Sequence, residues 1–243
     1  MQKILGYMRR AITEFDMLSD GDKVAVGVSG GKDSLILLKG LVLLRNFIGI
    51  DYDVTAITLD PCFGGVPGDY SAVGELCDSL GVPYILEQSH IGEIVFDIRH
   101  EEHPCSLCAR MRRGALHNEA KKAGCTKVAL GHHYNDAVET FIMNLFVEGR
   151  IGCFAPKAYL TRREIGVIRP LVFAPEYEIK RAARKEDLRI VKSKCPVDGH
   201  TMREQTKQFL ADREREDHGF TDRIFGAMRR AGIDGWGYKE KGE

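Results

Sequence analysis

The stretch KVAVGVSGGKDSLILL, residues 23–38, constrains the fold of this chain more than any other segment. It begins with a short apolar, β-branched run typical of a buried strand, and the leucine-rich run after Ser34 is typical of a buried helix. Between them, Gly30 and Gly31 allow the backbone to take positive φ values and to approach a ligand closely. The unpaired N–H groups of the following helix point at this turn. The segment therefore predicts a strand, an anion-binding turn and a helix in succession.

The ordinary phosphate loop, G-x-x-x-x-G-K-[ST], differs from this turn at one decisive position. Asp33 follows Lys32 where a Mg²⁺-binding serine or threonine would stand, and Ser34 comes one residue late. A plain connector is the other alternative, but the whole turn consists of glycine and polar residues. It resembles the SGGxDS signature of PP-loop ATP pyrophosphatases, which cleave ATP between the α and β phosphates. The resemblance implies an ATP-binding set made of Ser29, Gly30, Gly31, Lys32, Asp33 and Ser34.

Length and composition favour one main core. The chain has 243 residues, of which 44% are hydrophobic, and it shows no internal repeat. No apolar run approaches the roughly 18 residues of a membrane-spanning helix, and the first residues lack a signal-peptide pattern. We therefore expect a cytoplasmic protein without a membrane partner.

Strands alternate with helices along the first two thirds of the chain, which predicts an α/β fold. We expect a Rossmann-like parallel sheet of about five strands flanked by helices, in the manner of PP-loop ATP pyrophosphatases. The expected strands cover residues 23–28, 53–59, 83–86, 127–130 and 166–171, and the expected helices cover 4–15, a stretch from 34, 70–80, 107–123 and 135–146. Ligands of such sheets bind beyond the carboxyl ends of the strands, where both the glycine turn and the stretch ALGHHYND fall.

Four parts are expected along the chain. An N-terminal helix (1–20) precedes the PP-loop domain (21–175), and a small helical C-terminal lobe (176–231) contains a short strand at 189–191. The Gly-rich tail (232–243) has few apolar anchors, which favours disorder.

The charge balance provides no general attraction to nucleic acid. Lys+Arg and Asp+Glu both number 35, so an RNA site must be a local patch. Basic clusters that qualify are Arg110, Arg112 and Arg113; Arg162 and Arg163; Lys180, Arg181, Arg184 and Lys185; and Lys192 and Lys194. Solvated helix faces with acidic neighbours remain the alternative for each cluster.

Seven cysteines without a secretory signal point to metal or sulfur chemistry more than to disulfides. Cys105 and Cys108 form a C-x-x-C at the start of an expected helix, where the helix N-terminus and nearby arginines should lower the thiol pKa. The strand that precedes a thioredoxin-like pair is missing, as is the second Cys or His pair of a structural zinc site. Cys195 lies in an expected loop between lysines and a proline. It is either a lone loop thiol or a partner of the other two, and three thiolates can hold a [4Fe–4S] cluster with one iron left open to bind sulfide.

Taken in order, these motifs resemble one family closely, the tRNA 2-thiocytidine synthetases. SGGKDS, PCSLC with its arginine-rich continuation, GHHxxD and a later third cysteine all fit, and the likeness runs from about Arg9 to Cys195. It implies an ATP-dependent tRNA thiolase that adenylates the C2 carbonyl oxygen of a cytidine and replaces that oxygen with sulfur. The implied cofactors are ATP, Mg²⁺ and a [4Fe–4S] cluster held by Cys105, Cys108 and Cys195.

The resemblance also assigns roles to further residues. Lys32 compensates charge on the departing pyrophosphate, and Arg112 stabilises the adenylate or its leaving phosphate unless it only makes a surface ion pair. Asp136 lies near Mg²⁺ or the phosphates, whereas Asn135 departs from the aspartate of the family's GHHxDD. Gly131 and His132 complete the ATP-binding set.

The implied partners are tRNA and a sulfur donor, either a cysteine desulfurase or free sulfide, and we expect a homodimer. Thiolation of another base or another substrate stays open, and so does a non-catalytic iron–sulfur sensor that binds nucleotide. A lysidine synthase would need no cysteine triad, and a persulfide-based thiouridine synthetase would need no cluster.

Overall fold

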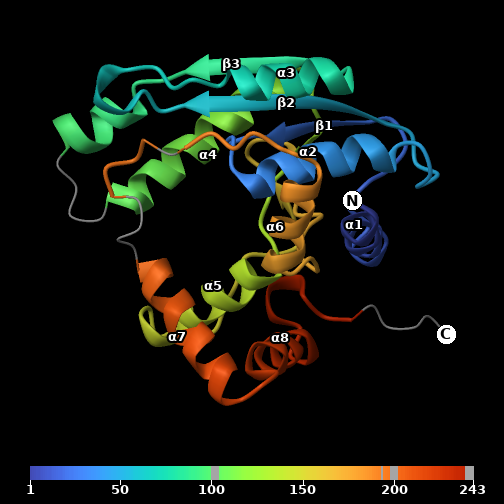
Figure 1. Cartoon of the computed structure of the whole chain (residues 1–243), viewed down its shortest axis with the longest axis vertical. Helices are drawn as coiled ribbons and strands as arrows, with labels where there is room; N and C mark the ends of the chain where they lie inside the picture. The colour runs from blue at the N-terminus through green and yellow to red at the C-terminus, as the bar shows by residue number, and fades with distance from the viewer. Residues whose placement is uncertain (100–103, 193, 198–201, 239–243) are drawn as a thin grey trace.

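The computed structural model describes residues 1–99, 104–192, 194–197 and 202–238. Its centre is a six-stranded sheet in the order β3-β2-β1-β4-β6-β5 (Figure 1). The strands are β1 (Asp22–Gly27), β2 (Tyr52–Asp60), β3 (Tyr84–Gln88), β4 (Lys127–Ala129), β5 (Lys157–Leu160) and β6 (Ile165–Ile168). All neighbouring pairs are parallel except β5 and β6, which are antiparallel. The predicted parallel sheet is confirmed, with β5 as an additional edge strand.

Helices connect and cover these strands. They are α1 (Gln2–Glu14), α2 (Lys32–Leu44), α3 (Ser71–Leu80), α4 (Pro104–Lys122), α5 (Tyr134–Phe146), α6 (Glu176–Lys185), α7 (Met202–Glu216) and α8 (Phe220–Arg230), with short turns of other helix types at Phe63–Gly65, Glu93–Ile98 and Ile233–Gly235. The predicted helices are present, and the largest shift is at α4, which begins three residues before the predicted 107. None of the helices in the described residues is both long and apolar enough to cross a membrane.

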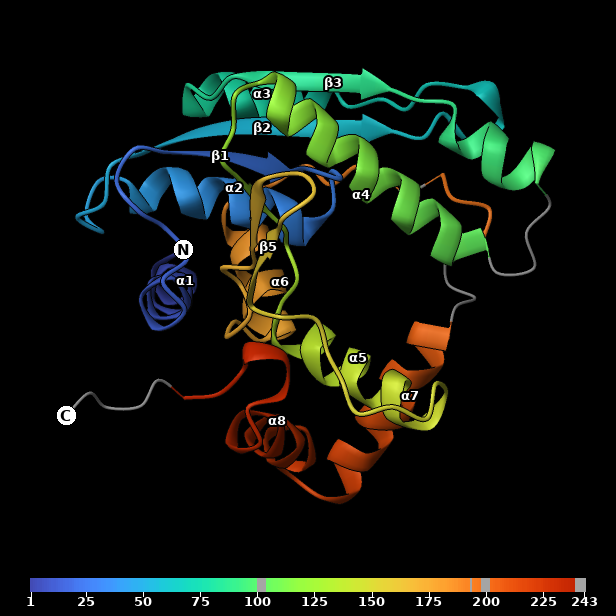
Figure 2. The same ribbon diagram turned by 180° about the vertical axis from the view of Figure 1, so that it is seen from behind.

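The two faces of the sheet follow from the alternation of side chains along β1. Val24 and Val26 pack with the leucines of α2 in the larger core, whereas Ala25 packs on the other face with Leu116 and Ala120 of α4. Figure 2 shows α4 crossing this second face. The carboxyl ends of the parallel strands therefore lie between α2 on one face of the sheet and α4 on the other.

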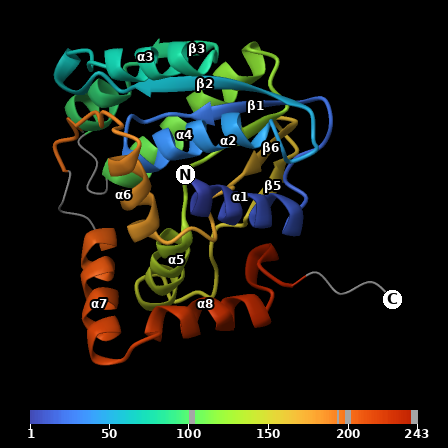
Figure 3. The same ribbon diagram turned by 45° about the vertical axis from the view of Figure 1, so that its right-hand side comes forward.

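The C-terminal helices do not all lie together. α6 packs against α1 and α2, whereas α7 and α8 pack against α5 away from the sheet (Figure 3). The boundary expected at residue 175 therefore stays a prediction, since α5 precedes it and yet contacts α7 and α8.

One expectation about the C-terminal part is wrong, and the expected disorder of the tail stays a prediction. No strand forms at 189–191, because the N–H of Val191 bonds to the carbonyl oxygen of Gly30 and not to a neighbouring strand. The tail does have an apolar anchor, since Trp236 is fully buried and donates from Nε1 to the carbonyl oxygen of Phe154 at 2.7 Å. Residues 239–243 lie outside the described part of the chain.

Candidate active site

The turn between β1 and α2 is held in shape by its own two serines. Ser34 Oγ donates to the carbonyl oxygen of Gly31 at 2.9 Å and accepts the backbone N–H of Ser29 at 3.2 Å. Gly30 has φ +80°, which a side chain would strain, and Gly31 precedes the helix without a capping side chain among the described residues. The first N–H groups of α2 are thus left for an anion.

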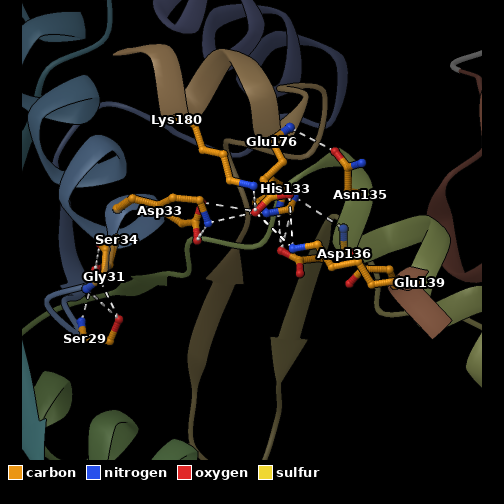
Figure 4. Close-up of polar contacts among 12 residues, drawn as sticks. Ser29, Gly31, Asp33, Ser34, His133, Asn135, Asp136, Glu139, Glu176 and Lys180 are labelled. Carbon is orange, nitrogen blue, oxygen red and sulfur yellow. Dashed lines mark hydrogen bonds and ion pairs between the residues drawn. The ribbon is translucent and has the colours of Figure 1, made fainter. Parts of the chain in front are cut away.

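A second helix begins beside this turn. His133 caps α5: its Nδ1 accepts the backbone N–H of Asp136 at 3.3 Å, and its own N–H donates to Asp136 Oδ2 at 2.9 Å. His133 Nε2 lies 3.7 Å from Oδ1 of Asp33 (Figure 4). That Oδ1 is buried and accepts no hydrogen bond from the described residues. The imidazole therefore lies between the carboxylates of Asp33 and Asp136.

The ammonium group of Lys32 lies between Asp33 and the first residue of α6. Its Nζ lies 3.0 Å from Asp33 Oδ2 and 3.1 Å from Glu176 Oε1. The Glu176 carboxylate also forms ion pairs with the Nζ atoms of Lys180, at 3.1 Å, and Lys207, at 3.2 Å. Burial alone would raise the pKa of Glu176, but the hydrogen bonds from Lys32 and Lys180 lower it to about 2. The Glu176 carboxylate thus pairs with three lysine ammonium groups beside the turn.

The side chain of Asn135 links the start of α5 to the start of α6. Its Oδ1 accepts the backbone N–H of Glu176, the first residue of α6, at 2.9 Å. Figure 4 shows the amide directed toward Glu176. An amide oxygen does this as well as a carboxylate, which explains why asparagine is tolerated at this position.

A cavity of about 550 Å³ joins the turn to α4. Most of the residues predicted for the site line it: Ser29, Asp33, Ser34, Arg112, Gly131, His132 and Asp136. Its apolar wall comes from the ends of β1, β2 and β4, including Ile57 and Leu130. A Cβ at Gly131 would lie 3.2 Å from the backbone of Asp33 and Ser34, so any larger residue would push the segment after β4 and the turn slightly apart. The size and lining suit a nucleotide.

His132 is held as a neutral ring on the cavity wall. Arg169 Nε donates to His132 Nδ1 at 3.2 Å, and the Phe154 ring centroid lies 4.9 Å from that of His132. Burial, followed by the charge of Arg169, holds the pKa of His132 well below its ordinary value.

Arg203 of α7 closes the cavity next to Asp136. Its Nη1 lies 3.0 Å from Asp136 Oδ1 and 3.6 Å from Oε2 of the buried Glu139. Burial, with the charge of Asp136, raises the pKa of Glu139 to about 7. The cavity therefore has arginines on both sides, Arg112 on α4 and Arg203 on α7.

The three predicted cluster cysteines lie near one another at the start of α4. Cys105 is exposed, Cys108 is buried, and Cys195 is near enough to act electrostatically on both thiols. The expected lowering of the thiol pKa is wrong: burial raises the pKa of Cys105 and of Cys108, although Arg112 opposes the rise at Cys108. Among the described residues, no three His, Cys, Asp or Glu side chains are placed to hold a single metal ion.

Sequence reasoning missed the residues that surround Lys32 and Asp136. Glu176, Lys207 and Arg203 lie far along the chain from the motifs, on helices whose charges look like an ordinary solvated face. Glu176 could have been found from its position in the chain alone. It begins the helix that follows β6, and the start of such a helix lies at the carboxyl edge of the sheet, where ligands bind.

Comparison with known proteins agrees with this geometry. The family model described as a PP-loop domain matches residues 6–213. The tRNA-cytidine(32) 2-sulfurtransferase of Geobacter sulfurreducens is 38% identical over 222 residues, which cover 89% of this chain and 84% of that protein. The chain belongs to the tRNA-cytidine(32) 2-sulfurtransferase family of PP-loop proteins. The resemblance predicted from the ordered motifs is thereby confirmed.

Two further comparisons support this membership and the fold. The tRNA-cytidine(32) 2-sulfurtransferase of Pelobacter propionicus is 39% identical over 210 residues, covering 85% of this chain and 77% of that protein. The solved U34-tRNA thiolase NcsA from Methanococcus maripaludis, with its [4Fe-4S] cluster, superposes with a TM-score of 0.73 at 23% identity, covering 93% of this chain and 77% of that chain. The α/β arrangement of this 2-sulfurtransferase family member is therefore that of a known PP-loop fold.

Proposed function

We propose that this protein is an ATP-dependent tRNA sulfurtransferase that thiolates C2 of cytidine 32, the activity named for its relatives. The observation that carries the proposal is the cavity of about 550 Å³, which is bounded by the PP-loop on one side and by α4 on the other. α4 also carries Cys105 and Cys108 near its N-terminus. The nucleotide-activating loop and the helix that carries two of the thiols thus border the same cavity, which Arg112 lines between them.

ATP activation is assigned to the residues of the loop and its neighbours. The backbone of residues 29–34 receives the pyrophosphate part of ATP, and Lys32 compensates its charge as it leaves. Gly131 and His132 contact the nucleoside side of the cavity, and Arg112 binds the α-phosphate of the adenylate.

Mg²⁺ fits the two carboxylates beside His133. Oδ1 of Asp33 is buried without a hydrogen-bond donor, which is costly unless a cation or another ligand meets it. Asp136 lines the same cavity, and carboxylate oxygens are the ligands that Mg²⁺ prefers. We assign Asp33 and Asp136 to Mg²⁺ and the phosphates, with Asn135 outside the metal's ligands.

The three cysteines fit an iron–sulfur cluster by their chemistry. Cys105, Cys108 and Cys195 lie on two segments and act on one another electrostatically, and thiolates are the usual ligands of such clusters. A [4Fe–4S] cluster bound by three thiolates supplies an iron free of protein ligands that can carry sulfide. Arg112 lies between this region and the nucleotide cavity, since its charge acts on Cys108 while its side chain lines the cavity.

The reaction that these residues serve is balanced without net electron transfer. The C2 carbonyl oxygen attacks the α-phosphorus of ATP, and pyrophosphate leaves toward Lys32. Hydrosulfide then bonds to C2, AMP leaves with the former base oxygen, and the proton of the hydrosulfide is released as the C2 thiocarbonyl forms. Arg112 and Arg203, on opposite sides of the cavity, stabilise the charge of the phosphoryl group through both steps.

The test is anaerobic reconstitution followed by measurement of iron, acid-labile sulfide, the absorption spectrum and ATP-dependent 2-thiocytidine formation in tRNA. Wild type should bind about four irons and four sulfides, and Cys195→Ala should lose or destabilise them. Cys153→Ala is the matched control, because Cys153 is not among the three proposed ligands and its thiol donates to the carbonyl oxygen of Ala137 on α5. A wild type that stays colourless or binds zinc after reconstitution would contradict the cluster assignment, and so would a Cys195→Ala variant that stays fully active.

The remaining assignments follow from the same proposal. The sulfur donor is a cysteine desulfurase or free sulfide, the working form is a homodimer, and the enzyme acts in the cytoplasm. Sedimentation of the reconstituted protein with and without tRNA tests the dimer directly.

A further inference from the structure

Two arginine clusters that are about fifty residues apart in the sequence form one surface. Arg163, on the turn between β5 and β6, donates from Nη1 to the carbonyl oxygen of Gly114 at 3.0 Å and to Asn118 of α4. This fixes the turn beside α4, next to Arg113 and one helical turn beyond Arg110. The surface, called here the arginine strip, comprises Arg110, Arg112, Arg113, Arg162 and Arg163.

The arginine strip has no acidic partners in the part of the chain that the structure describes. Arg110, Arg112 and Arg162 make neither an ion pair nor a hydrogen bond there, and Arg113 and Arg163 bond only to backbone carbonyls and an amide. The nearby acids already pair with lysines: Glu164 with Lys121 at 3.1 Å, and Glu119 with Lys122 at 2.6 Å. Among the residues that the structure describes, the positive charge of the strip is therefore uncompensated.

The strip borders the reaction cavity. Arg112 and Arg113 line the cavity wall, while Arg110 and Arg162 are exposed and do not line it. In Figure 2, α4 faces the viewer along its whole length. A ligand bound along the strip would thus place one of its parts at the cavity mouth.

Another basic cluster lacks this placement. Arg181 and Arg184 are exposed on α6, which packs against α1 and α2 on the opposite face of the sheet. Lys180 of the same helix is bound to Glu176 at 3.1 Å. Charge alone therefore does not distinguish the two clusters, but access to the cavity does.

We propose that the arginine strip is the docking surface for the phosphate backbone of the substrate RNA, with the target base directed into the cavity beside Arg112. This inference rests on the proposed tRNA activity and adds the place where the RNA lies. Guanidinium groups bind phosphates with paired hydrogen bonds, and each phosphate neutralised releases counterions, so affinity should fall with salt.

The test is the affinity of an unmodified tRNA transcript, measured by fluorescence anisotropy over a range of salt concentrations. The variant Arg110→Gln/Arg162→Gln removes two strip charges outside the cavity, and Arg181→Gln/Arg184→Gln removes the same charge from α6. We expect the strip variant to bind tRNA on the order of tenfold more weakly, with a salt slope smaller by about one to two units. The α6 variant should bind like wild type, and both variants should bind ATP like wild type.

Three outcomes would overturn the docking site. Equal weakening by both variants would show a general charge effect, and an unchanged salt slope in the strip variant would show that no phosphates lie there. Unchanged tRNA affinity with lost sulfur transfer from a cysteine desulfurase would assign the strip to an acidic protein. Failure of wild type to bind and thiolate tRNA would instead contradict the proposed function itself.

Discussion

The backbone N–H of Val191 donates a hydrogen bond of 3.0 Å to the carbonyl oxygen of Gly30. Gly30 belongs to the PP-loop, and Val191 lies four residues before Cys195. The segment that carries the third cysteine is therefore attached directly to the nucleotide-binding turn. This contact also replaces the strand that was expected at 189–191.

Gly30→Ala should destabilise the protein and abolish tight ATP binding. A Cβ at this position would lie 2.6 Å from the Cβ of Val191, and the residue has φ +80°. The left-handed conformation and the overpacking together should lower the free energy of unfolding by about 3 kcal/mol. Urea denaturation and ATP titration measure the two effects.

Gly31→Ala is the matched control for stability. Its Cβ would meet only Ser29 Oγ at 3.5 Å, and φ is −76°, so the fold should keep nearly its full stability. Gly30→Ala/Val191→Gly should recover the part of the loss that comes from the clash. Equal stability of Gly30→Ala and Gly31→Ala would contradict the close approach of Val191.

Asn135→Ala should lower stability, whereas Asn135→Asp should not. Alanine leaves the N–H of Glu176 without the acceptor that now lies at 2.9 Å, at a cost of about 1 kcal/mol. Aspartate keeps an acceptor near two helix N-termini, so its stability should stay within about 0.5 kcal/mol of wild type. Thermal denaturation of both variants decides the matter, and an equal loss in both would show that Asn135 has another role.

The sequence was sufficient for the parts of the site that depend on local chemistry. Three of these parts lie at helix starts near the carboxyl edge of the sheet: the turn at 29–34, the stretch from Gly131 to Asp136 and the C-x-x-C of α4. Short motifs and the hydrophobic periodicity of the flanking strands and helices are enough to predict such positions. β5 was missed because it is a four-residue edge strand with exposed side chains at alternate positions. The lysines around Glu176 and the link from Arg163 to α4 depend on packing between distant helices, which no local pattern encodes.

The thiol pKa values were also beyond sequence reasoning. A helix start and arginines favour the thiolate, but the sequence does not reveal that Cys108 packs with Ile91 and Val95 in a small apolar cluster. Burial there outweighs the charge of Arg112 and raises the thiol pKa.

Trp236→Ala should destabilise the protein strongly and also weaken ATP binding. Trp236 is fully buried against Phe15, Phe154 and Phe225, and Phe154 lines the cavity beside His132. The lost ring should cost about 3–5 kcal/mol of unfolding free energy. Trp236→Phe keeps a ring but loses the bond to the Phe154 carbonyl, so its cost should be about 1 kcal/mol. A melting temperature unchanged by the alanine substitution would contradict the anchoring of the C-terminal segment.

Glu139→Gln should stabilise the protein at alkaline pH and have little effect in acid. The pKa of Glu139 is about 7 in the fold, because of burial and the charge of Asp136, whereas an unfolded glutamate has a pKa of about 4.3. Between these values the folded state binds the proton more tightly, so stability falls as pH rises from about 4.3 to 7. The neutral glutamine avoids this loss, which amounts to about 3–4 kcal/mol above pH 7. Urea unfolding of both proteins at about pH 5 and 8, without Mg²⁺ or nucleotide, should show the difference grow with pH, and a constant difference would mean that Glu139 stays ionised throughout.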